Sequence, residues 1–121
     1  MLNREQRYIC NQQKELFEYA QKQGADIGKF AKNFLNSNFC NNNLDKPYST
    51  QQYDDIFNWL EFLEFENCLI IPENKNNIPI EVAGWLGFTY RHLHFNTGLL
   101  SKEIINKATW RSFSLVSVST F

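Results

Sequence analysis

The chain has 121 residues, of which 43% are hydrophobic and 16% aromatic, enough to bury a core within one domain spanning residues 1–121. Its formal net charge of −1 excludes the strongly basic surface from which most nucleic-acid-binding proteins draw their affinity. The longest strictly apolar run, Cys68 to Ile71, is too short to span a bilayer, so we expect no membrane contact.

The start of the chain and its cysteines both favour a cytoplasmic location. The first ten residues mix charges of both signs and are not followed by an apolar stretch, so we expect no secretory signal. Cys10, Cys40 and Cys68 form no CxxC pair, and their odd number fits reduced thiols. We interpret them as buried structural cysteines.

Helical spacing of apolar residues predicts two helices in the first third of the chain. The first runs from Arg4 to Gln23 and ends at Gly24. Asp26 can cap the second, whose apolar positions recur at helical spacing through Leu35. The helix frays into the asparagine-rich residues 36–43, and the turn-forming residues and proline of 41–48 predict a loop.

An acidic helix is predicted next. Ser49 and Gln52 form a capping-box pattern, and the apolar spacing behind it continues to about Asn67. No lysine or arginine lies between Ser49 and Asn67 to balance the carboxylates Asp54, Asp55, Glu61, Glu64 and Glu66. This face is either an ordinary solvated surface or a docking surface for a basic partner, whose association it would accelerate.

The segment from Ile78 to Gly98 carries the densest run of large apolar and aromatic residues. Placed at helical spacing, these side chains lie nearly all the way round the axis, which is typical of a core helix. Pro79 suits the first turn of such a helix. We therefore predict an all-α fold, a compact bundle of five to six helices around a buried central helix at about 79–97.

Two groups of residues interrupt the apolar pattern of this central helix. Ala83 and Gly87, with His94 on the same line, form a small-residue patch that lets another helix approach closely. The other group is a polar stripe formed by Glu81, Thr89, His92 and Asn96. Its side chains need hydrogen-bond partners wherever they are buried. We take the stripe as a candidate site of unassigned role.

The sequence carries no pattern that fixes a catalytic chemistry. His92 and His94 point roughly 200° apart on a helix and cannot share a metal ion. HExxH, GxSxG, GxGxxG and phosphate-binding glycine loops are all missing from the sequence. We expect no catalytic residue, no metal and no cofactor, with a small enzyme built around His92 as one alternative.

A second alternative is a helix-turn-helix regulator using residues 98–116. Ser101 can cap a short helix through Ala108, and Thr109 can cap another. A recognition helix needs several basic and polar side chains, whereas Arg111 is the only cation after Lys107, so DNA is the less favoured partner. The tail, residues 112–121, alternates small and β-branched residues and is either a strand or a frayed end.

The run GWLGFTYRHLHFNTGLLSKEI, from Gly84 to Ile104, resembles a family of small bacterial proteins with the pattern WxGYxYRYxHxxTGxxSKEI. The chain departs from that pattern at Leu99 and Leu100, where the family has a more polar pair. The matching residues cover about a fifth of the chain: Trp85, Gly87, Tyr90, Arg91, His94, Thr97, Gly98, Ser101, Lys102, Glu103 and Ile104.

Genes of this family often lie beside predicted toxin genes. The resemblance therefore implies an all-helical, non-catalytic partner in a toxin–antitoxin or similar conflict system. We expect a module that binds and neutralises a toxin or effector protein, and self-association with a second copy stays open. The residues predicted to bind the partner are Asp54, Asp55, Glu61, Glu64, Tyr90, Arg91, His94 and Thr97.

Overall fold

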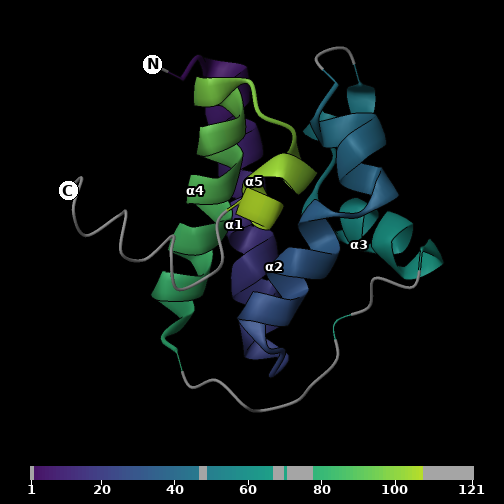
Figure 1. Ribbon diagram of the computed structural model, residues 1–121. Coiled ribbons are helices and arrows are strands. Elements are labelled where there is room, and N and C mark those ends of the chain that lie inside the picture. Colours follow the sequence, from purple (N-terminus) through teal and green to yellow (C-terminus); the bar gives the residue numbers. More distant parts are fainter. Residues whose placement is uncertain (1, 47–48, 67–69, 71–77, 108–121) are drawn as a thin grey trace, which may run out of the picture.

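The fold is built on two long helices, α1 (Arg4–Lys22) and α4 (Ile80–Thr97), which lie side by side and antiparallel (Figure 1). The computed structural model describes residues 2–46, 49–66, 70 and 78–107. The other helices are α2 (Ile27–Leu35), α3 (Ile56–Phe65) and α5 (Ser101–Lys107), with a π-helical turn η1 (Cys40–Leu44) and a 3₁₀ turn η2 (Thr50–Tyr53). Within the described residues the predicted all-α bundle is confirmed, and no helix there has the length and apolar character to cross a membrane.

Local signals set the ends of the first two helices. The Asn3 side chain accepts a hydrogen bond from the Gln6 backbone at 2.7 Å, and the Gln6 side chain accepts one from the Asn3 backbone at 3.1 Å, forming a capping box. Gly24 ends α1 with φ +84°, a conformation that favours glycine. Asp26 caps α2 by accepting from the Lys29 backbone at 3.1 Å, as predicted.

Glycine allows α1 and α4 to approach closely. A Cβ added to Gly87 would lie 2.6 Å from the backbone oxygen of Gln13 and 2.7 Å from Cγ of Phe17. Because real side chains do not approach so near, any larger residue there would force the helices apart. The predicted small-residue patch on the central helix is therefore confirmed at Gly87, and Ala83 is fully buried on the same helix.

Aromatic side chains from three helices meet around Phe17 in the core. Its ring makes edge contacts with Phe30 and Phe34 of α2, at centroid distances of 5.2 and 5.9 Å, and a tilted contact with Tyr90 of α4 at 6.3 Å. These contacts join the α1–α4 pair to α2.

The predicted central helix has the expected bounds and buries one side. Leu86, Gly87, Tyr90 and Arg91 are buried among the core residues. Trp85, on the opposite side, is 39% exposed, and α4 is therefore open to solvent along part of its length.

The predicted helix from Ser49 to Asn67 is wrong at its start. Ser49 donates to the Asn43 side chain at 2.9 Å and makes no cap hydrogen bond, so its capping box does not form. The chain makes the short turn η2 and then restarts as α3, because the Asp55 carboxylate accepts from the Phe57 and Asn58 backbones at 3.1 and 3.0 Å. Asp55 is thus the N-cap of α3.

Two other local predictions differ from the structure. Part of the predicted asparagine-rich loop is the π-helical turn η1. Ser101 is the first residue of α5, not its cap; Glu103 accepts instead from the Leu100 backbone at 3.0 Å. The predicted second helix at Thr109 and the tail at 112–121 lie outside the described residues.

Candidate functional site

A buried arginine is the centre of a polar cluster in the described part of the chain. The Arg91 guanidinium is fully buried, and its Nε donates to Oε1 of Gln13 at 2.9 Å. Its Nη1 donates to Oδ1 of Asp45 at 3.0 Å, and its Nη2 donates to Oγ of Ser101 at 2.9 Å and lies 3.6 Å from Sγ of Cys40. A buried guanidinium of this kind requires a carboxylate and several acceptors, and Arg91 has both.

Asp45 completes the cluster from the end of η1. Its Oδ1 accepts from Oγ of Ser101 at 2.6 Å, and its Oδ2 accepts from the Ser101 backbone at 3.1 Å. Gln13 in turn donates through Nε2 to the backbone oxygen of Gly87 at 2.8 Å. The cluster therefore joins α1, η1, α4 and the start of α5 through hydrogen bonds that satisfy its buried polar groups.

His94 lies at the edge of this cluster and is held neutral. Burial is the main factor that lowers its pKa, and the nearby positive charge of Arg91 lowers it further. The ring Nδ1 lies 2.7 Å from the backbone oxygen of Leu99 and 3.6 Å from Oδ1 of Asp45. Because a carbonyl oxygen only accepts, Nδ1 carries the proton and donates it to Leu99.

The two described cysteines are buried and unreactive in this state. Burial raises the pKa of the Cys10 and Cys40 thiols to about 12, although Arg91 opposes the rise in both. Thiols with such pKa values stay protonated near neutral pH and are poor nucleophiles. The predicted role as buried thiols is confirmed for these two residues, and Cys68 lies outside the described ones.

The buried cluster corrects part of the predicted partner surface. Tyr90 and Arg91 are buried in the core and present no surface to a partner, because Arg91 is hydrogen-bonded inside the protein. His94 is mostly buried, and Thr97 uses its hydroxyl at the end of α4, where it donates to Leu93 and accepts from the Leu99 backbone. The roles visible for Tyr90, Arg91 and His94 are structural, whereas Thr97 is exposed and its role in partner binding stays a prediction.

Arg91 is among the site residues predicted from the sequence, but its buried partners, Gln13 and Asp45, are not. A usable signal was present, since Arg91 falls on the same helix face as Ala83 and Gly87 and a cation on a buried face needs a carboxylate. The position of that carboxylate could not be found from local spacing, because Asp45 is 46 residues away along the chain.

The predicted polar stripe does not form one site. Thr89 donates to the backbone oxygen of Trp85 at 2.7 Å, a bond within its own helix. The ring of His92 makes an edge contact with Phe88, at a centroid distance of 6.1 Å. Asn96 and Glu81 are exposed near opposite ends of α4.

The predicted acidic residues are at the surface and lie beside exposed aromatic rings. Asp55, Glu61 and Glu64 are exposed and Asp54 is half-buried. On α3, Phe65 is 92% exposed and Phe57 62% exposed. Spacing along the helix brings five exposed residues to one side, which we call the α3 face: Phe57, Glu61, Phe62, Glu64 and Phe65.

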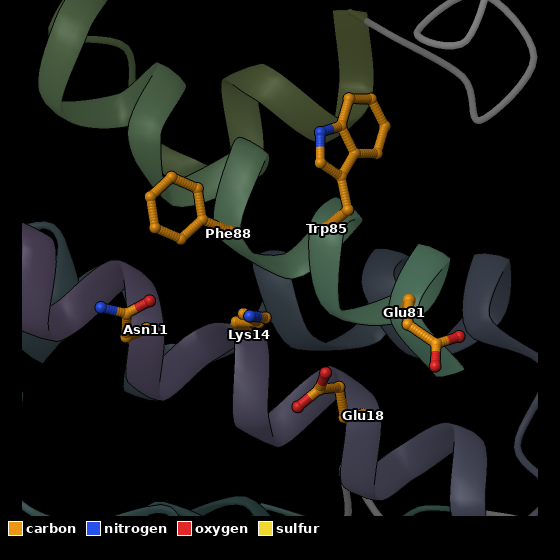
Figure 2. A pocket seen from close by; sticks show the side chains of 6 residues that line it. All are labelled: Asn11, Lys14, Glu18, Glu81, Trp85 and Phe88. Atoms are coloured by element: carbon orange, nitrogen blue, oxygen red, sulfur yellow. The ribbon is translucent and has the colours of Figure 1, made fainter. Parts of the chain in front are cut away.

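A second surface feature is a hollow of about 290 Å³ between α1 and α4. Figure 2 shows its lining side chains, with Asn11, Lys14 and Glu18 on α1 and Glu81, Trp85 and Phe88 on α4. Only Glu81 of this group was predicted as a site residue from the sequence, because the group comes together through the packing of two helices that are distant in sequence.

The part of the chain that the structure describes contains no group of three or more histidine, cysteine or acidic side chains placed to hold a metal ion. Of the predicted helix-turn-helix, only the first helix, α5, lies within the described residues, and Lys102 is exposed on it. Comparisons with protein-family models, curated proteins and solved structures found no match to this chain.

Proposed function

We propose that this chain is a non-catalytic protein-binding module that recognises a basic partner through the α3 face. The observation that carries the proposal is the alternation of exposed aromatic rings with unopposed carboxylates on one short helix. Aromatic side chains, phenylalanine included, are enriched at the centres of protein interfaces, and clusters of exposed apolar side chains often mark such interaction sites. Phe65, at 92% exposure, is the clearest case.

Charge favours a basic partner over an acidic one. Residues 49–66 carry five carboxylates and no lysine or arginine, whereas the whole chain has a net charge of only −1. Such a local negative field accelerates encounter with a positively charged surface and raises affinity less. The resemblance to proteins encoded beside predicted toxins supports a toxin or other effector as this partner, which the chain would neutralise by occupying its surface.

The helix that carries the α3 face is anchored to the rest of the protein on its inner side. Trp59 and Leu63 anchor the inner side of α3 in the core, and the Trp59 indole donates to the Gln51 backbone at 2.9 Å. The Glu66 carboxylate accepts from the backbones of Asn38 and Phe39, both at 2.7 Å. A surface held in place in this way loses little conformational entropy on binding.

The test is co-expression with the product of the neighbouring gene. Growth and co-purification would be compared for the parent chain, for Phe65→Ser, and for Glu61→Gln combined with Glu64→Gln. Phe65→Ser should raise the Kd at least about tenfold, as expected for an aromatic anchor. The Gln pair should slow association and weaken its dependence on salt, because it removes two charges from the face.

A matched control keeps the test specific. Glu5 and Glu15 are exposed on α1 and are not residues of the α3 face, so Glu5→Gln with Glu15→Gln removes the same charge and leaves every residue of the face unchanged. If both double variants weaken partner binding equally, the loss of net charge explains the effect and the position of the charges on the α3 face does not. A neighbouring product that binds Phe65→Ser as tightly as the parent chain would rule out the α3 face as the recognition surface.

A further inference from the structure

We propose that the hollow between α1 and α4 binds a cationic side chain, a lysine or arginine presented by a partner protein. Two carboxylates, Glu18 and Glu81, and two aromatic rings, Trp85 and Phe88, line the same space of about 290 Å³ (Figure 2). Carboxylates recognise the charged head of such a side chain, and aromatic rings contact its methylene stem or the cation itself. The hollow is built from α1 and α4, so this inference does not depend on the α3 face.

Glu18 lies against the helix that it faces. A Cβ added to Gly84 would lie 2.7 Å from Cγ and 2.8 Å from Oε2 of Glu18, so the side chain lies directly against the α4 backbone. Glycine at this position is what lets the carboxylate lie there. Glu18 is half-buried, which confines its side chain before any ligand arrives.

Glu18 and Glu81 form no ion pair with any cation in the described part of the chain. The ion pair found there joins Asp45 to Arg91, and the neutral His94 ring lies 3.6 Å from the same carboxylate. Lys14 lines the hollow as well, but no bond of 4 Å or less joins it to either glutamate among the described residues. A partly desolvated carboxylate without a counter-charge gains when a cation enters.

Size and charge set the class of ligand. The hollow is at the lower end of the volumes that hold whole small molecules, and it suits one extended side chain better than a cofactor. The lining carries two negative charges and one positive charge, which excludes an anionic ligand such as a phosphate. Lys14 competes with an incoming cation for the two glutamates. Removing the charge of Lys14 should therefore strengthen binding, whereas removing the glutamate charges should weaken it.

The experiment is a titration of the full chain followed by NMR, using the indole N–H signal of Trp85 assigned by Trp85→Phe. The probes are n-butylammonium, n-butylguanidinium and neutral n-butanol, at constant ionic strength. A capped tripeptide with a central lysine and its norleucine counterpart distinguish a side chain in a peptide from a free amine. We expect saturable shifts with both cations and the lysine peptide, and none with n-butanol or the norleucine peptide.

Substitutions test which residues carry the binding. Glu18→Gln with Glu81→Gln should weaken binding of the lysine peptide at least tenfold, whereas Lys14→Gln should tighten it. Glu15→Gln, an exposed carboxylate outside the lining, should leave it unchanged. Phe88→Leu should cost about two- to fivefold, the amount expected for loss of one exposed cation–aromatic contact.

Three results would overturn the proposal. They are equal shifts with n-butanol and n-butylammonium, parent-like binding by the Glu18 and Glu81 double variant, or weaker binding after Lys14→Gln. Gly84→Ala provides an independent check, because its methyl group displaces Glu18 without removing a charge. It should weaken binding while Asn11→Ala, which removes an uncharged side chain of the lining, does not, and a thermal melt of each variant confirms that it is folded.

Discussion

Arg91 and Asp45 form an ion pair of 3.0 Å in which both side chains are almost completely buried, although the residues are 46 positions apart in the chain. Ser101 bridges the pair, since its hydroxyl accepts from Arg91 and donates to Asp45. The pair therefore ties the turn η1 to α4 and α5. Its energetic value lies in this complete set of hydrogen bonds, because two buried charges alone gain little over apolar side chains.

Removing either partner should destabilise the fold strongly. Arg91→Met leaves the Asp45 carboxylate buried without a counter-charge, and we expect a loss of about 3–5 kcal/mol in the free energy of unfolding. Asp45→Asn leaves the buried Arg91 guanidinium without a counter-charge, and we expect a similar loss in the free energy of unfolding. Urea denaturation followed by circular dichroism at pH 7 measures both.

The double variant provides the contrast. Arg91→Met together with Asp45→Asn removes both charges, and its loss should be clearly smaller than the sum of the two single losses. Additive losses would mean that the two side chains contribute independently and that the ion pair has no special role.

Ser101→Ala should release α5 more than it destabilises the rest of the protein. The substitution removes the hydroxyl that bridges Arg91 and Asp45, which leaves buried polar groups short of a partner, at a cost of about 1–3 kcal/mol. Amide hydrogen exchange should accelerate in residues 102–107 before it does so in α1. Lys102→Ala, exposed on the same helix, should change stability by less than about 0.5 kcal/mol.

Helices with local signals were predicted from the sequence, and long-range polar contacts were not. The bounds of α1 and α4 follow from apolar spacing with Gly24 and Gly98 as stops, and both are within a residue or two of the structure. The segment after Ser49 was misjudged because two N-cap residues, Ser49 and Asp55, compete there. Tertiary hydrogen bonds decide the outcome, since Ser49 is engaged by Asn43.

The candidate site was predictable only in part, for a related reason. Glu61 and Glu64 lie on the surface as the charge pattern of α3 indicates. Arg91 was predicted to bind a partner, whereas the structure buries it against Gln13 and Asp45. Those partners lie on other elements, and one sequence contains no signal for a contact between segments so far apart.

Gly87→Ala should separate α1 from α4. The added methyl group would lie 2.6 Å from a backbone oxygen, which cannot move without shifting the whole helix, and we expect a loss of about 1–3 kcal/mol. Gly98→Ala is the matched control for loss of a glycine. Its Cβ meets nothing within 4 Å, and only the strain of φ +78° applies, at about 1–2 kcal/mol.

The two glycine variants differ in where their effects appear. Gly87→Ala should shift NMR signals of Gln13 and Phe17 on α1, because these residues meet the new methyl group. Gly98→Ala should shift signals only around the turn between α4 and α5. Unchanged α1 signals in a destabilised Gly87→Ala protein would show that helix packing is not the cause.

Acidification should weaken the fold through His94. Its pKa in the folded protein is lowered below the ordinary value of 6.5 by burial and by Arg91, so the unfolded chain binds more protons in the range just below pH 6.5. Stability is therefore fully present above pH 6.5 and falls as the pH drops toward the folded-state pKa. His94→Gln should flatten this part of the profile, measured as the urea midpoint between pH 7.5 and 5 at constant ionic strength.

His92→Gln controls for loss of a histidine from the same helix, and it should leave the contribution of His94 in place because His92 packs against Phe88. A profile that stays equally steep in His94→Gln would assign the acid sensitivity to other groups and leave the neutral His94–Leu99 hydrogen bond without a role in it.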